Sequence, residues 1–241
     1  MRASLTLICQ GETAASRGSH FPCDDPLEAR EWQRARQLQS RVARCHRVWI
    51  SPETAARQTA AALSLQGTPV MELAEPDYGI WAGRPVREVM TQDADAFLAW
   101  LEGDPPPGGE SRAQLLARCG RWLAKHVDIP GRHGVIASAS TIRAMILNVL
   151  GAPLHSFARI DVHPLSITEL RSDGRRWNFC LLRDDIKGEC STVSRWFDGV
   201  PLKPSASKRL AIDGSVHWSC IAKPNAIEPL SALHAPSCVK K

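Results

Sequence analysis

Short apolar stretches alternate with longer amphipathic ones along the first three quarters of the chain, and this order limits the fold more than any other feature. The longer stretches carry apolar residues at the three- and four-residue spacing of a helix face. Strands that alternate with helices predict a parallel sheet covered on both faces. We therefore expect an α/β fold with three α/β/α layers, a mostly parallel sheet and a small helical insertion. Expected strands span residues 4–9, 46–50, 70–72, 134–138, 159–162, 166–171 and 175–182, and expected helices span residues 27–42, 54–65, 86–90, 94–101, 111–127 and 141–150.

The chain changes character twice. Residues 76–110 hold two short helical stretches and a Pro-Pro-Pro-Gly-Gly break at 105–109, which predicts an insertion beside the sheet. After about Arg183 the periodic pattern ends, and residues 185–241 contain five prolines and three glycines. We expect one domain over residues 1–184 and an irregular, poorly ordered tail over residues 185–241.

The composition argues against several classes of partner and cofactor. Lys and Arg number 30 and Asp and Glu 25, a net charge of +5 that is dispersed rather than gathered on one basic face. No apolar run approaches the roughly 18 residues of a membrane span, and the N-terminus lacks the apolar core of a secretory signal. The eight cysteines form no Cys-x-x-Cys pair, and the eight histidines show no paired metal spacing. We expect a cytoplasmic protein with reduced thiols, no nucleic-acid or membrane partner, and no metal or other cofactor.

Six segments follow one another in an order that is typical of one enzyme family. The first, Leu5-Thr-Leu-Ile-Cys-Gln-Gly-Glu-Thr13, lies where that family has a strand, Arg-His-Gly and Glu-Thr. The second, Ser51-Pro-Glu-Thr-Ala-Ala-Arg-Gln-Thr-Ala60, lies where it has Ser-Pro, Arg-Ala and Gln-Thr-Ala. The others span residues 75–83, 108–111, 135–143 and 161–170. Over about residues 4–183 the chain thus resembles the histidine phosphatase superfamily, which includes phosphoglycerate mutases and α-ribazole phosphatases.

The resemblance implies a phosphoglycerate mutase-like fold, with a pocket at the carboxyl ends of the parallel strands. In that family a neutral histidine accepts the phosphoryl group, while two arginines and a second histidine surround its oxygens. A carboxylic acid protonates the leaving alcohol. This chain has Cys9 and Ala55 at the two arginine positions, Gln10 at the nucleophile and Ser138 at the second histidine. The acid is retained, because Glu75 matches the family's proton donor.

The retained and replaced positions together predict a pocket that does not run the family's reaction. Gly11, Thr13 and Ser16 match neutral substrate contacts, and we expect them to bind a ligand. The amide nitrogen of Gln10 cannot form a stable phosphoryl intermediate, and the lost cations leave a phosphate dianion poorly neutralised. Cys9 lacks the arginine six positions later that cysteine phosphatases use, since that residue is Ala15.

Other side chains near these motifs have expected positions. Arg57 lies about 200° around its helix from Ala55 and should face away from the pocket. We expect Arg143 to be solvated or paired on the surface, and Trp81 and Trp100 to line the pocket mouth.

The sequence leaves three hypotheses, which differ in whether the chain is an enzyme. The first is a degenerate phosphatase domain that binds a small molecule, neutral or cationic, or an unknown protein. The second is a residual phosphomonoester hydrolase that uses Glu75 on small metabolites, in the cobalamin pathway that α-ribazole phosphatases imply. The third is a non-functional product, of which the irregular tail would be the sign.

Overall fold

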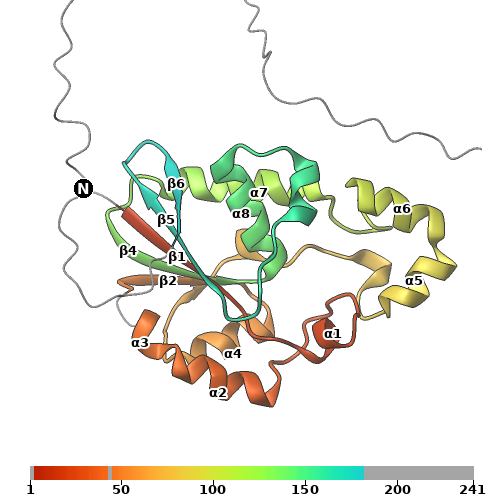
Figure 1. Cartoon of the computed structure of the whole chain (residues 1–241), viewed down its shortest axis with the longest axis horizontal. Coiled ribbons are helices and arrows are strands. Elements are labelled where there is room, and N and C mark those ends of the chain that lie inside the picture. The colour runs from red at the N-terminus through yellow and green to blue at the C-terminus, as the bar shows by residue number, and fades with distance from the viewer. Residues whose placement is uncertain (1–2, 43–44, 182–241) are drawn as a thin grey trace, which may run out of the picture. The chain divides into compact units, whose positions relative to one another are not determined.

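Six strands form one sheet in the order β3-β2-β4-β1-β5-β6 (Figure 1). The computed structural model describes residues 3–42 and 45–181. These belong to the first of the two units into which the chain divides, Met1–Lys187 and Gly188–Lys241. The tail expected at residues 185–241 lies outside the described residues, so the predicted boundary at residue 184 stays a prediction.

The sheet is mostly parallel, as predicted. Its parallel strands are β1 (Ala3–Cys9), β2 (Arg47–Ile50), β3 (Thr68–Pro69) and β4 (Gly131–Ala137), and the antiparallel ones are β5 (Ile167–Ser172) and β6 (Trp177–Cys180). The central strand β1 is covered on both faces. Its successive residues Leu7 and Ile8 point to opposite faces and enter two different core clusters.

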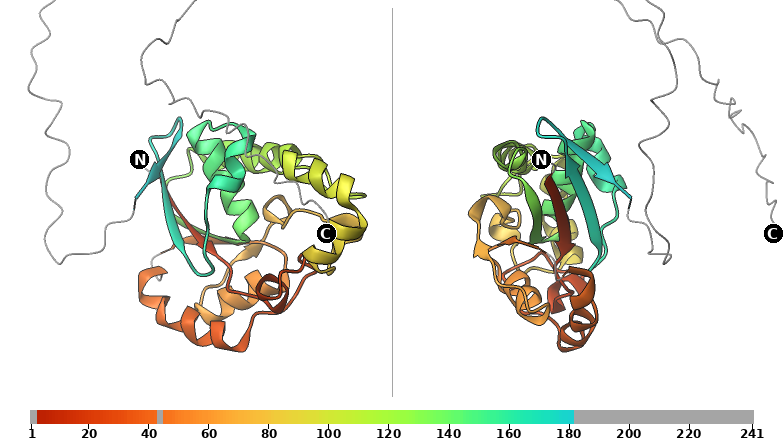
Figure 2. Two further views of the ribbon diagram at one scale, coloured as in Figure 1. Left: turned by 45° about the vertical axis from the view of Figure 1, so that its right-hand side comes forward. Right: turned by 90° about the vertical axis from the view of Figure 1, so that its left-hand side faces the viewer.

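Helices cover both faces of the sheet, which gives the three predicted layers (Figure 2). One face packs against α7 (Arg112–His126) and α8 (Ala139–Leu150), and the other against α2 (Ala29–Gln37) and α4 (Thr54–Ala62). Trp122 of α7 and Met145 of α8 join the cluster of Leu7, whereas Ala35 and Ala56 join that of Ile8. The short helices are α1 (Ala14–Arg17) and α3 (Gln39–Val42).

The predicted helical insertion has a small core of its own. It comprises α5 (Val86–Gln92) and α6 (Ala94–Glu102), preceded by the 3₁₀ turn η2 (Gly79–Trp81), and lies beyond one end of the sheet (Figure 1). Trp81, Val89 and Phe97 pack together with Phe21. The indole N–H of Trp81 donates to Asp93 at 3.0 Å, so the buried ring has its polar atom satisfied.

Three expected elements are wrong. Residues 70–72 are no strand: the pairing ends at Pro69 on the sheet edge, and the 3₁₀ turn η1 (Met71–Leu73) carries Leu73 into the core. Residues 159–162 are no strand either, because β4 and β5 already occupy both sides of β1. The 3₁₀ turn η3 (Leu154–Arg159) ends at the first of these residues. The helix expected at 27–42 is divided at Leu38 into α2 and α3.

Two glycines of the insertion offer a matched test of this packing. Gly79 and Gly108 both have positive φ, +54° and +75°. A Cβ on Gly79 would lie 2.1 Å from the carbonyl oxygen of Pro107, whereas nothing lies within 4 Å of one on Gly108. We expect Gly108→Ala to lower the free energy of unfolding by about 1–2 kcal/mol, and Gly79→Ala by about 2 kcal/mol more. Urea unfolding measures both, and equal losses would contradict the close approach.

Candidate functional site

The ends of β1 and β4 bring two of the replaced family positions together. The strands pair in parallel with Cys9 opposite Ala137, so the residues that follow, Gln10 and Ser138, leave the sheet side by side. The backbone N–H of Gln10 donates to the carbonyl of Ala137 at 2.9 Å. Ser138 is 2% exposed and caps the N-terminus of α8, where its hydroxyl accepts from the backbone N–H of Thr141.

A hydrogen-bond relay ties the same region to α4. The backbone N–H of Gly11 donates to the hydroxyl of Thr59 at 3.0 Å, and that hydroxyl donates to the carbonyl of Ala55 at 2.7 Å. Ala55 is buried in the first turn of α4. Gly11 has no room for a side chain, since a Cβ would lie 2.4 Å from Leu27. The relay therefore fixes the loop after β1 through backbone and hydroxyl groups alone.

Cys9 is a buried, protonated thiol. Its side chain is 2% exposed, and burial, with a smaller contribution from the Glu75 carboxylate, raises its pKa to about 12. A reactive cysteine needs the opposite, a pKa lowered by nearby cations or a helix N-terminus. The structure thus places Cys9 at the end of β1 as a packing residue.

Glu75 lies beside Ser138 with its proton affinity raised. Its side chain forms a hydrogen bond with that of Ser138, and burial, followed by the nearby Glu53 carboxylate, raises the pKa of Glu75 to about 8. Glu53 also accepts a hydrogen bond from the backbone N–H of Glu75 at 2.9 Å. At neutral pH Glu75 is therefore largely a neutral acid.

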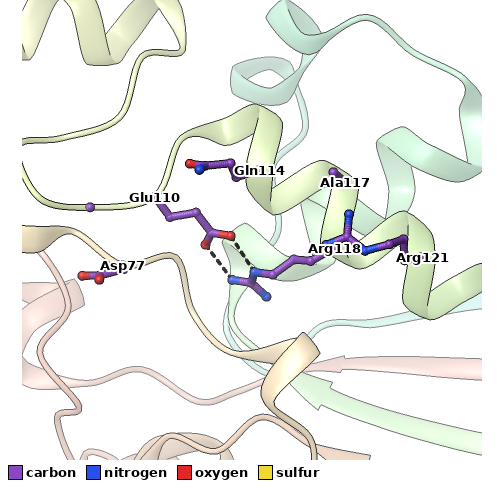
Figure 3. A pocket seen from close by; sticks show the side chains of 7 residues that line it. Asp77, Glu110, Gln114, Ala117, Arg118 and Arg121 are labelled. Atoms are coloured by element: carbon purple, nitrogen blue, oxygen red, sulfur yellow. Dashed lines mark hydrogen bonds and ion pairs between the residues drawn. The ribbon is translucent and has the colours of Figure 1, made fainter.

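Arg118 of α7 holds the Glu75 segment in place from outside. Its guanidinium donates to the carbonyls of Glu72 and Ala74 at 2.9 and 2.7 Å. It also forms two hydrogen bonds with the carboxylate of Glu110, at 2.7 and 2.9 Å. Figure 3 shows this pair facing a surface cavity of about 400 Å³. The charge of Arg118 is therefore neutralised by Glu110.

Gln10 has an acceptor without a partner. Its side-chain oxygen is buried and receives no hydrogen bond from the part of the chain that the structure describes. A buried carbonyl of this kind costs about 1–3 kcal/mol unless a donor reaches it. The atom is therefore suited to accept a hydrogen bond from a ligand or water.

The neutral contacts expected from the sequence are engaged within the fold. The hydroxyl of Thr13 accepts from the backbone N–H of Ser16 at 3.2 Å, and that of Ser16 accepts from the backbone N–H of Thr13 at 3.0 Å. This capping box begins α1. Gly11, as described above, is bonded to Thr59. That these three residues contact a ligand stays a prediction.

The two arginines considered from the sequence lie in different places. Arg57 is exposed, in agreement with a position on the outer side of α4. Arg143 is paired with the exposed Asp161 at 3.8 Å, as expected, but its side chain is only 27% exposed and also borders a cavity of about 300 Å³. Trp100 lines this cavity as predicted, but Trp81 does not, because it is fully buried in the core of the insertion. Arg112 and Phe157 also line it, and no sequence signal marked them.

The described residues contain neither a metal-binding cluster nor a membrane-spanning helix. No group of three or more His, Cys, Asp or Glu side chains within residues 3–42 and 45–181 is arranged to hold a metal ion. None of the helices in the same part of the chain is both long and apolar enough to span a bilayer.

Comparison with known proteins establishes the family. The model of the histidine phosphatase superfamily (branch 1) matches residues 5–185, so the chain belongs to this superfamily, as the sequence motifs predicted. A curated relative, phosphoserine phosphatase 1 from Hydrogenobacter thermophilus, is 27% identical over 168 residues, which are 64% of this chain and 78% of the relative.

Solved structures of phosphatases share the fold. The α-ribazole phosphatase from Shigella flexneri superimposes with a TM-score of 0.68 at 23% identity, over 76% of this chain and 96% of that one. A mycobacterial glucosyl-3-phosphoglycerate phosphatase gives a TM-score of 0.66 at 22% identity, over 74% and 97% of the two chains. The phosphoglycerate mutase-like fold is thereby confirmed.

The raised pKa of Glu75 makes the stability depend on pH. The folded protein holds this proton up to about pH 8, whereas the unfolded chain releases it near 4.5, so stability falls as the pH rises between these values. Glu75→Gln removes the effect. Relative to the native protein, its free energy of unfolding should rise through this window, by about 5 kcal/mol at about pH 9. Glu72→Gln, exposed in the same segment, is the control, and an identical pH profile for both variants would refute the assignment.

Burial of the Cys9 thiol predicts that it is alkylated slowly. With its pKa at about 12, Cys9 should react with iodoacetamide at least about 100-fold more slowly than the exposed Cys23 in the folded protein at about pH 8. Peptide mapping by mass spectrometry measures both rates. In urea the two should react alike, and comparable rates in the native protein would show that Cys9 is an accessible thiolate.

Proposed function

We propose that this histidine phosphatase-family domain does not transfer phosphoryl groups and instead binds a small molecule or a protein partner. The observation that carries the proposal is the composition of the pocket edge. Gln10 and Ser138 stand side by side at the ends of β1 and β4, where the family reaction requires a nucleophilic histidine and a second histidine.

The loss of the nucleophile is decisive for the family reaction. The lone pair of an amide nitrogen is delocalised into its carbonyl, so Gln10 cannot carry a phosphoryl group. Cys9 does not take over, because burial keeps its thiol protonated and raises its pKa to about 12. Removing a single charge-stabilising donor already costs about 10²–10³ in rate, and three such positions are changed here.

The charges around the ends of β1 and β4 support a ligand other than a phosphate dianion. Glu53 and Glu75 lie close together, Arg118 is neutralised by Glu110, and Arg143 acts on Glu75 less strongly than Glu53 does. The unpartnered oxygen of Gln10 adds an acceptor. These groups favour a ligand that is neutral or cationic overall and brings hydrogen-bond donors.

One observation favours a second candidate, a residual phosphomonoester hydrolase. A pKa of about 8 keeps Glu75 protonated at neutrality, which a proton donor to a leaving alcohol requires. The similarity to phosphoserine and α-ribazole phosphatases points to small metabolites, including those of cobalamin metabolism. We rank this candidate second because it lacks a nucleophile. We also propose a cytoplasmic location and no nucleic-acid or membrane partner.

Hydrolysis of 4-nitrophenyl phosphate separates the two candidates. We expect the native protein to show no turnover above buffer, since it has neither nucleophile nor phosphate-binding cations. The variant Cys9→Arg/Gln10→His/Ala55→Arg/Ser138→His should regain measurable activity. The triple variant that keeps Gln10 is the matched control and should stay inactive. Turnover by the native protein that is abolished by Glu75→Ala would overturn the proposal in favour of the hydrolase.

A further inference from the structure

We propose that the cavity of about 300 Å³ between α6, the start of α7 and α8 binds a small organic oxyanion with an aromatic body. The inference rests on the proposed binding role and names the class of ligand. It is independent of whether phosphoryl transfer has been lost. A ligand that is neutral overall but carries an acidic group satisfies both this cavity and the acceptor groups around Gln10.

Two arginines face one aromatic ring in the wall of this cavity. The guanidinium carbons of Arg112 and Arg143 lie 5.5 and 5.9 Å from the ring centroid of Phe157. Arg112 also lies over Trp100, at 5.1 Å from its centroid. Each ring attracts the cations, so aromatic faces help to hold the two like charges near one another.

The guanidinium groups use few of their donors within the protein. Arg112 donates to the carbonyl of Leu101 at 2.7 Å and, among the described residues, forms no salt bridge. Arg143 donates to the carbonyl of Ile160 at 2.7 Å. Its ion pair with Asp161 is long, at 3.8 Å, and the Asp161 side chain is 75% exposed, so solvent screens this pair.

The electrostatics of Arg112 show that Arg143 acts on it as a like charge. Burial lowers the pKa of Arg112, and repulsion from Arg143 lowers it further, while Tyr78 and Glu102 act in the opposite direction. A guanidinium stays charged at neutral pH in spite of such a shift. An anion placed between the two arginines would relieve this repulsion and accept the remaining N–H donors of both.

The other walls define the body of the ligand. Tyr78, Trp100 and Phe157 supply aromatic surface, and the hydroxyls of Ser111 and Ser140 add neutral hydrogen-bonding groups. Burial raises the pKa of Tyr78, so its hydroxyl stays neutral and does not oppose an anion. The volume lies at the small end of the roughly 300–1,000 Å³ typical of ligand sites, which suits a single substituted ring.

Three probes that differ in the acidic group test the proposal on the full chain. Benzoate and phenyl phosphate carry the oxyanion as a carboxylate and as a phosphate ester, and benzamide is the neutral analogue. In ligand-observed NMR titrations we expect at least one anion to bind saturably, and benzamide to bind at least about 10-fold more weakly. Whichever anion binds more tightly identifies the source of the oxyanion.

Variants of the two arginines tie the binding to this cavity. Arg112→Gln and Arg143→Gln should each weaken the anion about 10-fold or more, and Arg112→Lys should weaken it less because the charge remains. Arg121→Gln removes the same charge from an exposed position of α7 outside this cavity and should leave binding unchanged. Thermal melting confirms that each variant is folded.

The proposal is overturned if no anion binds saturably in the millimolar range, if benzamide binds as tightly as the anions, or if folded arginine variants bind like the native protein. Failure of the oxyanion-binding proposal can be told apart from failure of the proposed function. Phosphatase turnover by the native protein would refute the proposed function and leave the benzoate and benzamide titrations unaffected.

Discussion

The parallel pairing of β1 with β4 is the interaction on which the candidate site depends. It sets Cys9 opposite Ala137, and the next residue of each strand therefore leaves the sheet at the same edge. The carboxyl ends of neighbouring parallel strands lie at the same edge of the sheet, so side chains from distant parts of the sequence meet there. Positions 10 and 138, separated by 128 residues in the chain, become neighbours through this pairing alone.

The groups around this edge are mostly neutral or acidic. Burial, followed by Glu53, raises the pKa of Glu75, and Cys9 stays a neutral thiol. The arginines that remain are either neutralised, as Arg118 is by Glu110, or displaced towards the cavity beside Phe157, as Arg143 is. The charge of Arg143 still acts on Cys9 and Glu75, although burial outweighs it at both residues.

The layers, the mostly parallel sheet and the insertion could be predicted because each depends on local periodicity and turn residues. The position of Gln10 and Ser138 at the strand ends could also be predicted, since the family motifs place them there.

The prediction of a strand at residues 159–162 was wrong. The alternation of apolar residues there reflects packing of Ile160 and Val162 against the core without a sheet partner. Arg112 could not be found, because a charged residue in the first turn of a helix is ordinarily solvated, and only the fold brings Phe157 and Arg143 to it. Trp81 and Trp100 both belong to the insertion, yet packing buries the first and leaves the second on the cavity wall.

The hydrogen bonds that shape the loop after β1 come from the backbone of Gln10 and Gly11 and from the hydroxyl of Thr59. None of them uses the side chains at positions 9, 10, 55 or 138. The geometry of the loop is consequently set without the side chains of Cys9, Gln10 and Ala55, whereas the hydroxyl of Ser138 acts on the other strand end by capping α8. Such a scaffold lets mutation change or erase the chemistry while the fold is retained, and it gives an evolving or engineered sequence a ready frame for a different one.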